Sequence, residues 1–439
     1  MNLQDTLSNQ VQKLEDSKKI KIYLCGVTVY DESHIGHART IIVFDVLRKY
    51  LESKKVEVEF IQNFTDVDDK IINRATTENT SAEEISSRYI KNYFRDFDGL
   101  NIKRATNYPK ATEHIEDIIK FVEKLIGKKY AYVSKNGVYF SVSKFPEYGK
   151  LSKKKIDELQ SGSRIQIDET KKDPLDFAVW KFSDTNPTWE SPWGKGRPGW
   201  HIECSAMSVK YLGENFDIHG GGRDLIFPHH ENEIAQSECI SGKKFANYWI
   251  HNGLININKE KMSKSIGNIV NIKEGLKVWD KNIFRILFLT HHYRTPVDLS
   301  NKKLAEVGKS LLNLKKKLEI NESSSSNFKE LWVSAMLDDF NTAKALGYYF
   351  KFINDGKLSN KSTVELEEFE ETMGISGWRN DISNPTDKNP INKEEIEELI
   401  IERNKARSEK DWVKADKLRE RAEELGIKLL DNDEGTIWE

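Results

Sequence analysis

The feature that most constrains the fold is the apolar run at residues 20–27, IKIYLCGV, which has the β-branched and aromatic content of a buried strand. Residues 38–55 follow with apolar side chains at helical spacing, and residues 56–64 have the composition of a second strand. A strand, a helix and a strand within about fifty residues predict a parallel α/β unit, because parallel strands need a long crossover connection.

The middle of the chain interrupts this pattern. The stretch NGVYFSVS predicts a β-hairpin around Asn136 and Gly137, and the region up to Pro198 is rich in Trp, Pro and Gly. The strand and helix pattern resumes at GWHIECSAMSVKYL, FDIHGGGRDL and NYWIHNGLI. We therefore expect one sheet, completed by chain on both sides of an insertion, followed after about residue 300 by charged amphipathic helices.

Composition excludes several classes of protein. The mean hydropathy is −0.64, and no apolar run approaches the roughly 20 residues that span a bilayer. The N-terminus has no signal-peptide pattern, so we expect a cytoplasmic protein with no membrane partner. Cys25, Cys204 and Cys239 are too few for a disulfide framework. The net charge of −2 means that any RNA contact must come from local patches.

The tetrapeptide His34-Ile35-Gly36-His37 opens the first predicted helix. A helix N-terminus offers unpaired N–H groups and a positive dipole end, which suit a triphosphate. Two histidines three residues apart share one face and can donate hydrogen bonds to phosphate oxygens, while Gly36 lets a nucleotide approach the backbone. The alternative is a chance His-x-x-His at a helix start.

A second motif, KMSKS, occupies residues 261–265 after the strand-like GLININ. Lys261 and Lys264 in a mobile loop could close on a pyrophosphate leaving group, with most of their effect in the transition state. Alone, the motif is equally consistent with a solvated surface loop.

Four potential metal ligands are scattered along the chain. Cys25 ends the first strand, Cys204 lies in GWHIECSAM, and His229 and Glu233 share one face if FPHHENEIAQ is helical. Two thiolates, an imidazole and a carboxylate make a plausible zinc tetrad. The residues alone leave open a plainer interpretation, two buried cysteines and a capping His–Glu pair.

A glycine run offers a second nucleotide contact. Gly220, Gly221 and Gly222 are expected after the strand FDIH, where adenosine could pack against the backbone, and Asp224 could bind ribose hydroxyls. The run by itself is a weak signal.

Three further residues are candidates for the substrate pocket. Thr65 and Asp66 end the second strand, where open α/β sheets bind ligands, although a helix N-cap is the alternative. Trp200 is expected either to line the pocket or to be a core tryptophan.

The two motifs, HIGH and KMSKS in this order, resemble class I aminoacyl-tRNA synthetases. The wider pattern of GxTVYDxxHIGH, TDVDDK, GRPGWHIECSAM, FDIHGGGRDLxFPHHENEIAQ and KMSKS is similar to cysteinyl-tRNA synthetases and covers most of residues 20–300. The resemblance implies activation of L-cysteine with ATP, together with Mg²⁺, and transfer of cysteine to the 3′ end of tRNA(Cys) by a monomer.

The resemblance also implies residue roles. Zinc is expected on Cys25, Cys204, His229 and Glu233. Catalysis is expected from His34, His37, Lys261 and Lys264, and ATP binding from His34, Gly36, His37, Gly221, Gly222, Asp224 and Lys264. Thr65 and Trp200 are expected to contact substrate cysteine. Cys239 has no expected role beyond that of a buried thiol, and His230 has no firm assignment.

The metal has a chemical rationale. Serine differs from cysteine by one atom, and a pocket based on shape separates such near-isosteres by only about 1–3 kcal/mol. A thiolate binds zinc strongly, whereas an alcohol is a poor ligand that is hard to ionise. Zinc can therefore select cysteine.

The C-terminal segment contains candidates for anticodon recognition. Arg407, Trp412 and Asp416 lie in or beside a predicted helix, with Trp412 and Asp416 four residues apart on one face. An aromatic ring can stack on an unpaired base, while Arg and Asp can read base edges. The alternative is that Trp412 only packs a helical hairpin.

The predicted fold class is therefore α/β: a Rossmann-type parallel sheet with a connective insertion, then a helical bundle and a small C-terminal domain. The expected order is a first catalytic half at 1–127, the insertion at 128–198, a second catalytic half with the zinc ligands at 199–255, the KMSKS and stem-contact region at 256–300, a tRNA-binding bundle at 301–385 and an anticodon unit at 386–439.

Two other functions fit parts of the sequence. A related ligase that passes cysteine to an amino sugar would lack a tRNA-binding tail, and the long helical region after residue 300 argues against it. An inactive RNA-binding paralogue would not need intact motifs. A zinc protease is excluded because the H-E-x-x-H order is absent.

Overall fold

The computed structural model describes residues 1–155, 170–257, 260–262, 269–318, 327–355, 360–381, 393–409, 411–424, 429–432 and 435–438. Its centre is a parallel sheet in the order β10-β9-β3-β4. The strands are β3 (Lys19–Thr28), β4 (Glu57–Thr65), β9 (Phe216–Gly222) and β10 (Ala246–Asn252). The predicted first strand, helix and second strand are confirmed, with α1 (Ile35–Ser53) as the crossover. The α/β fold class is also confirmed.

Side chains on β3 alternate between two hydrophobic cores. Ile22 and Leu24 pack with Phe44 of α1, whereas Tyr23 and Cys25 pack with α6 (Trp200–Leu212) and α7 (Glu231–Ser241) on the opposite face. A parallel sheet is covered on both faces, so its strands are apolar throughout instead of alternating with polar residues. The strand period of two therefore directs the thiol of Cys25 towards α6.

The insertion contains a small antiparallel sheet in the order β5-β6-β7-β8. Its strands are β5 (Ala131–Ser134), β6 (Gly137–Phe140), β7 (Phe177–Phe182) and β8 (Gly196–Pro198). The predicted hairpin is present, because β5 and β6 pair from Ser134 and Gly137. The remaining elements between β4 and the insertion are α2 (Asp69–Glu78), α3 (Ala82–Gly99) and α4 (Ile115–Gly127).

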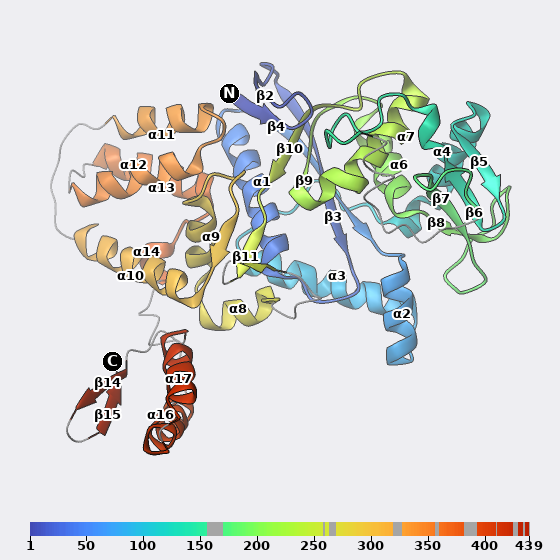
Figure 1. Ribbon diagram of the computed structural model, residues 1–439. Helices are drawn as coiled ribbons and strands as arrows, with labels where there is room; N and C mark the ends of the chain where they lie inside the picture. The colour runs from blue at the N-terminus through green and yellow to red at the C-terminus, as the bar shows by residue number, and fades with distance from the viewer. Residues whose placement is uncertain are drawn as a thin grey trace.

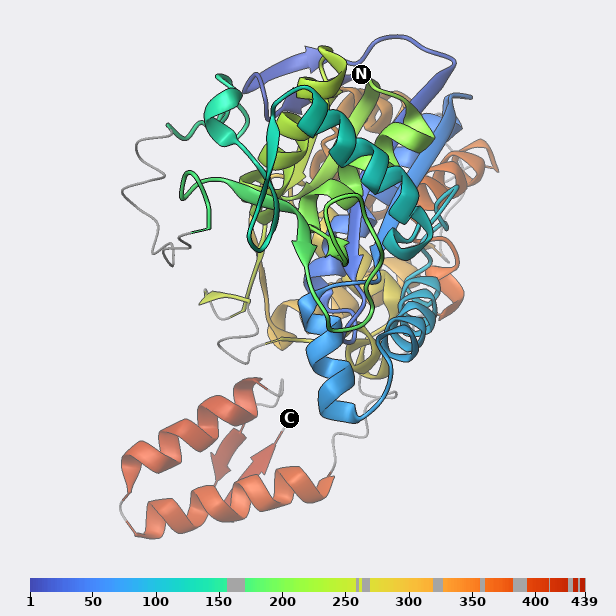
Figure 2. The ribbon, with the colours of Figure 1, turned by 90° about the vertical axis from the view of Figure 1, so that its right-hand side faces the viewer.

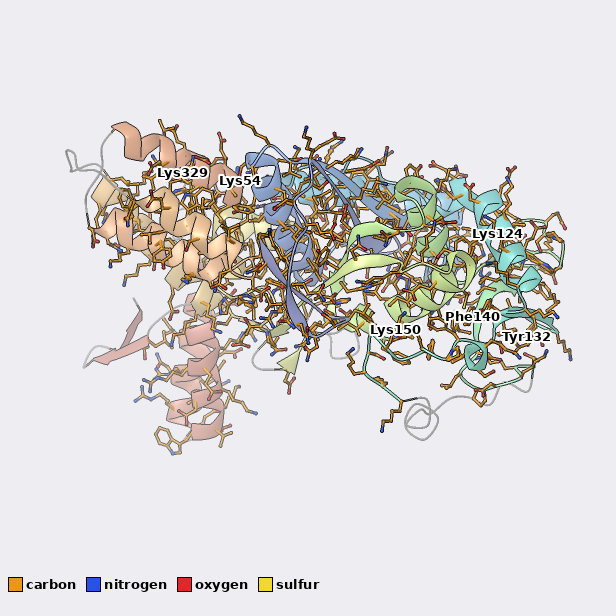
Figure 3. The ribbon with its side chains drawn as sticks, turned by 90° about the horizontal axis from the view of Figure 1, so that it is seen from above. Lys54, Lys124, Tyr132, Phe140, Lys150 and Lys329 are labelled. Carbon is orange, nitrogen blue, oxygen red and sulfur yellow. The ribbon has the colours of Figure 1, made fainter. Side chains whose placement is uncertain are left out.

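The expected helices after residue 300 form a bundle on the other side of the sheet (Figure 1). The helices of this side are α8 (Ile272–Val278), α9 (Lys281–Leu289), α10 (Asn301–Leu318), α11 (Phe328–Leu337), α12 (Thr342–Asn354), α13 (Asn360–Met373) and α14 (Trp378–Asp381). Seen from above, Lys54 and Lys329 mark the bundle side, and Tyr132 and Phe140 mark the insertion at the opposite end (Figure 3).

Short strands connect these parts. An N-terminal hairpin consists of β1 (Asn2–Asp5) and β2 (Gln10–Lys13), while β11 (Ile255–Ile257) pairs with β12 (Glu260–Lys261) and, in parallel, with β13 (Val297–Leu299). The C-terminal unit, α16 (Lys393–Ser408), α17 (Trp412–Glu424), β14 (Leu429–Asn432) and β15 (Gly435–Trp438), lies apart from the central sheet (Figure 2). The expected boundary at 385/386 lies outside the described residues. Within the described part of the chain, no helix is long and apolar enough to cross a bilayer.

Candidate active site and metal-ligand cluster

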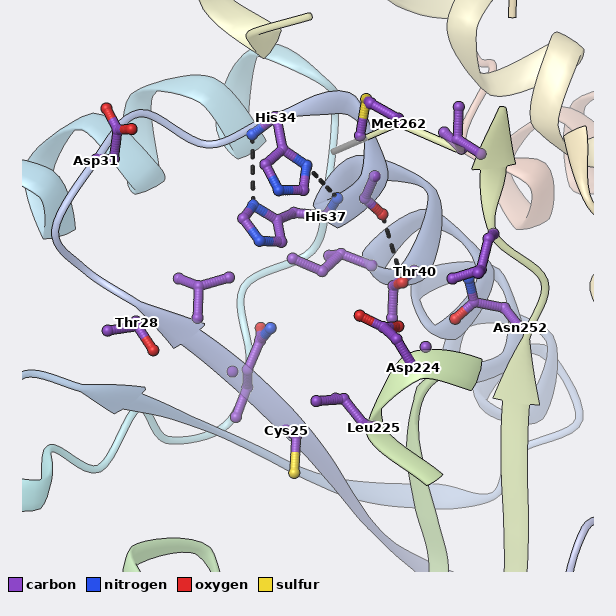
Figure 4. Close-up of a pocket in the computed structure, with 18 of the residues that line it drawn as sticks. Cys25, Thr28, Asp31, His34, His37, Thr40, Asp224, Leu225, Asn252 and Met262 are labelled. Atoms are coloured by element: carbon purple, nitrogen blue, oxygen red, sulfur yellow. Dashed lines mark hydrogen bonds between the residues drawn. The ribbon is translucent and has the colours of Figure 1, made fainter. Parts of the chain in front are cut away.

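A cavity of about 450 Å³ opens at the carboxyl end of the parallel sheet, where open α/β sheets place their ligands. The start of α1 forms one wall with His34, Gly36 and His37. Cys25 lies at its base, and Asp224 lies beside Thr40 of α1 (Figure 4). The first predicted motif therefore faces the same space as one of the predicted metal ligands.

Two histidines cap the first turn of α1. The Nδ1 atom of His34 accepts a hydrogen bond from the His37 backbone N–H, and His37 Nδ1 accepts one from the His34 N–H, both at 3.4 Å. Their rings stack with centroids 3.6 Å apart. These reciprocal contacts hold both imidazoles beside the helix N-terminus, where the dipole favours an anion.

The second motif approaches the first through Met262. A Cβ atom on Gly36 would stand 2.9 Å from the Cε of Met262 and 3.0 Å from the His34 ring, so only glycine fits there without a shift of its neighbours. The backbone of Lys261 ends β12, and Lys264 lies outside the described residues.

The four predicted metal ligands converge below the cavity. Cys25, Cys204, His229 and Glu233 are buried, and one ligand atom from each lies within 4.8 Å of all the others. The two sulfurs are 3.8 Å apart, Cys25 Sγ is 3.4 Å from a Glu233 oxygen, and His229 Nε2 is 3.0 Å from that same oxygen. His229 lies in a short irregular turn, Ile226–His230, that continues into α7, which provides the expected i, i+4 spacing.

The cluster is electrostatically coupled. A hydrogen bond from Cys25 lowers the pKa of Cys204 to about 6, while burial and the neighbouring Cys204 raise the pKa of Cys25 well above its usual value. Although burial opposes it, the Glu233 carboxylate and Cys204 raise the pKa of His229 to about 10. Cys25 and His229 therefore hold protons close to Glu233. A cation bound by the cluster would displace these protons, because thiols and imidazoles bind metal in their deprotonated forms.

The sequence did not point to the histidines around this cluster. His219 Nε2 lies 2.8 Å from the second oxygen of Glu233, and His230 Nε2 lies 3.3 Å from Cys25 Sγ. Together with Cys25 and Glu233 they form an overlapping set of possible ligands. His219 lies within β9 and His230 next to His229, so only the fold reveals that they share this space.

The predicted pocket residues have different surroundings. Trp200 is 40% exposed, lines the cavity and has its ring centroid 4.5 Å from that of His229, so the alternative of a core tryptophan is wrong. Thr65 is buried at the end of β4 and is not among the residues that line the cavity. Asp66 accepts hydrogen bonds from Thr112, and Asp68 caps α2 instead, so the N-cap alternative is also wrong.

The position of the glycine run must be corrected. Gly220, Gly221 and Gly222 do not follow the strand but form its last three residues, where they pair in parallel with β10. The space beside Gly220 is filled by the ring of Phe44, which would lie 2.2 Å from a Cβ atom. Gly222 and Asp224 line the cavity, whereas Gly221 is not among the residues that line it.

Two other sets of residues lie away from the cavity. Trp412 is 59% exposed at the start of α17, and Asp416 is exposed one turn later, while Arg407 lies near the end of α16. This exposure argues against the alternative that Trp412 only packs a helical hairpin. Cys239 is buried, and burial raises its pKa to about 12.

Comparison with known proteins separates the catalytic part from the C-terminal unit. Residues 10–309 match the family described as the class I (C) tRNA synthetase catalytic domain, and residues 390–438 match the cysteinyl-tRNA ligase anticodon binding domain. The fold is similar to methionyl-tRNA synthetase of Mycobacterium tuberculosis bound by methionyl-adenylate, with a TM-score of 0.60 and 14% identity over 84% of this chain and 92% of that chain.

Curated relatives match along nearly the whole chain. The cysteine–tRNA ligase of Thermodesulfovibrio yellowstonii is 50% identical, covering 100% of this chain and 99% of that protein. The corresponding ligase of Geobacter metallireducens is 47% identical over 96% of this chain and 95% of its own length. The chain therefore belongs to the cysteine–tRNA ligases, a family of class I aminoacyl-tRNA synthetases.

Proposed function

We propose that the chain joins L-cysteine to tRNA(Cys) in two steps at the cavity beside α1. The cysteine carboxylate first attacks the α-phosphate of ATP, giving cysteinyl-adenylate and pyrophosphate. A terminal ribose hydroxyl of tRNA then attacks the acyl carbon and releases AMP. The observation that carries this proposal is that Cys25 both lines the cavity and belongs to the buried cluster, so one space adjoins a phosphate-binding helix end and a set of metal ligands.

ATP would lie along the start of α1. His34 and His37 are held as a stacked pair at the helix N-terminus and would donate hydrogen bonds to phosphate oxygens as charge develops. Gly222 and Asp224 also line the cavity, where they would contact adenosine and its ribose. Lys261 and Lys264 would stabilise the departing pyrophosphate, together with Mg²⁺ carried by ATP. No protein nucleophile is needed.

The cluster fits zinc by its donor set and its spacing. With zinc–sulfur bonds of about 2.3 Å, tetrahedral coordination separates two sulfur ligands by about 3.8 Å, which is the distance between Cys25 and Cys204. His229 and Glu233 would complete the set, and the two thiolates favour it over the overlapping set that has one. His219 and His230 would then orient Glu233 and Cys25 from outside the ligand set.

Selection of cysteine follows from this arrangement. Bound zinc would act as a Lewis acid that binds the thiolate of substrate cysteine more strongly than the hydroxyl of serine. Trp200 packs against His229 at the base of the cavity and would shape the space for a side chain as small as that of cysteine. Thr65 is buried, so its side chain would have to move to contact the substrate.

Anticodon recognition is assigned to the C-terminal unit. Trp412 and Asp416 are exposed on α17 and would contact splayed bases together with Arg407. The match of residues 390–438 to an anticodon-binding family supports tRNA as acceptor instead of an amino sugar. We expect the enzyme to act as a monomer.

The direct experiment measures cysteine-dependent exchange of pyrophosphate into ATP, followed by charging of total tRNA. We expect exchange with cysteine but not with serine, and stable cysteinyl-tRNA. Exchange without acylation of any tRNA would reject the tRNA assignment and favour the amino-sugar ligase.

A further inference from the structure

Arg39, two residues after His37 in α1, is fully buried, and its Nη1 and Nη2 atoms bind backbone carbonyls of another part of the chain. Its guanidinium donates hydrogen bonds to the carbonyl oxygens of Leu254 at 2.8 Å, Tyr293 at 3.2 Å and Thr295. Among the described residues, no carboxylate forms an ion pair with it, and burial lowers its pKa to about 10, so it stays charged at neutral pH.

The three carbonyls belong to two segments that run side by side. The Gly253 N–H donates to Tyr293 at 2.8 Å, and the Val297 N–H donates to Leu254 at 3.0 Å. The same segments continue as the parallel strands β11 and β13. Gly253 and Leu254 also line the cavity, so Arg39 binds a segment that forms part of the cavity wall.

This junction is where the chain leaves the main sheet towards the KMSKS motif. The strand β10 ends at Asn252, β11 begins at Ile255, and the Met262 N–H returns to donate to the Ile255 carbonyl at 3.1 Å. Met262 in turn packs over Gly36, three residues before Arg39. Helix α1 therefore contacts this segment at two points. Arg39 contacts Leu254, just after the end of β10, and Gly36 contacts Met262, within the motif.

Burying a charge costs desolvation free energy even when carbonyl dipoles bind it, and an apolar side chain of similar volume would avoid that cost. The guanidinium has a different advantage: its rigid planar group holds several carbonyl acceptors in fixed relative positions. Lysine cannot reproduce that pattern, because it has a single ammonium group.

We propose that Arg39 is a positioning residue for adenylate formation, which sets the position of the two histidines of α1 relative to the segment from Leu254 to Met262. Arg39 does not line the cavity, so it would act through the backbone and not by touching substrate. This inference rests on the proposed function. It predicts a defect confined to the step that needs both motifs together.

The test compares Arg39→Lys with Arg285→Lys. Arg285 is an equally buried arginine that bonds the carbonyls of Met373 and Leu100 and pairs with Asp45, on the bundle side of α1. Three quantities are measured on folded protein: pyrophosphate exchange at varied ATP, cysteine affinity, and single-turnover transfer from preformed cysteinyl-adenylate to tRNA.

Because a displacement near 1 Å can cost about 100-fold in rate, Arg39→Lys should reduce exchange by roughly that factor. Cysteine affinity and transfer should stay close to wild type. Arg285→Lys should lower the unfolding midpoint and leave the ratio of exchange to transfer unchanged.

A second variant reaches the same junction with Arg39 intact. In Gly253→Ala the new Cβ would lie 2.5 Å from the Thr295 carbonyl carbon and oxygen, which should force the two segments apart and give the same selective loss of exchange. Equal loss of exchange and transfer in both variants, or the selective pattern in Arg285→Lys, would overturn the inference. Absence of cysteine-dependent exchange in the wild-type protein would instead contradict the proposed function.

Discussion

The sulfur atoms of Cys25 and Cys204 lie 3.8 Å apart although 179 positions separate them in the sequence. The carboxamide oxygen of Asn63 in β4 lies 3.6 Å from Cys204 Sγ and accepts a hydrogen bond at 2.9 Å from the backbone N–H of Gly26, the residue after Cys25. Strand alternation directs Cys25 towards α6, and α6 packs over β3 and β4. The pair of thiols is therefore a consequence of the parallel fold.

The zinc content of the protein should depend on Cys204, which lies in the ligand cluster, and not on Cys239, which lies outside it. Purified wild-type protein should hold about one zinc, and Cys204→Ser should lose it along with preference for cysteine over serine, because a hydroxyl is a poor zinc ligand. Cys239→Ser is the matched control, since Cys239 is also buried but lies outside the cluster. Elemental analysis and exchange with both amino acids measure the two effects. Active wild-type enzyme without zinc would refute this explanation of selectivity.

Gly36→Ala should impair use of ATP through a steric contact. The new methyl group would press on Met262 and on the His34 ring, which displaces the phosphate-binding wall, so kcat/KM for ATP should fall by about tenfold or more. Adding Met262→Ala removes one of the two contacts. The double variant should recover part of the loss, whereas purely additive effects would show that the two side chains do not interact.

Lys264→Ala should slow adenylate formation far more than it weakens cysteine binding. Its charge matters when pyrophosphate departs, and loss of one such transition-state contact costs roughly 100-fold or more in rate. Pre-steady-state adenylate formation and equilibrium binding of cysteine separate these effects. Equal losses in both would make Lys264 a general structural residue.

Truncation after residue 385 should separate activation from charging. The catalytic sheet is complete at Asn252, so cysteine-dependent exchange should remain nearly intact, while tRNA charging should fall sharply. A comparable fall in exchange would mean that the C-terminal unit supports the catalytic fold.

Trp412 provides a finer test in the full-length enzyme. Trp412→Ala should weaken charging of wild-type tRNA(Cys), since stacking on one base is worth about 1–3 kcal/mol. It should add little to the defect of a tRNA with an altered anticodon, because each change removes the same contact. Val413→Ala is the control, because Val413 is a neighbouring exposed residue of α17. Losses that simply add would exclude anticodon recognition through Trp412.

The parallel core and its motifs could be predicted because the information is local. Apolar runs mark β3 and β4, helical spacing marks α1, and HIGH lies at a helix start. The same reasoning misplaced Gly220–Gly222, because glycine in a sequence usually signals the end of a strand. Here the close approach of Phe44 requires a residue without a side chain at Gly220, inside the strand.

The surroundings of the site could not be predicted because they depend on tertiary contacts. His219 and His230 reach Glu233 and Cys25 only when β9, β3 and α7 are packed together. Arg39 resembles any arginine on an amphipathic helix, yet it binds carbonyls more than 200 positions away. No periodicity or spacing in the sequence encodes such contacts.

We propose that a metal held by Cys25, Cys204, His229 and Glu233 recognises the thiol of substrate cysteine. It can be tested by replacing the metal with Co²⁺ and recording the thiolate-to-metal charge-transfer absorption while cysteine or serine is added. Cysteine should increase this absorption, since it adds a sulfur ligand, and serine should not. Saturating cysteine that supports exchange but leaves the spectrum unchanged would contradict it.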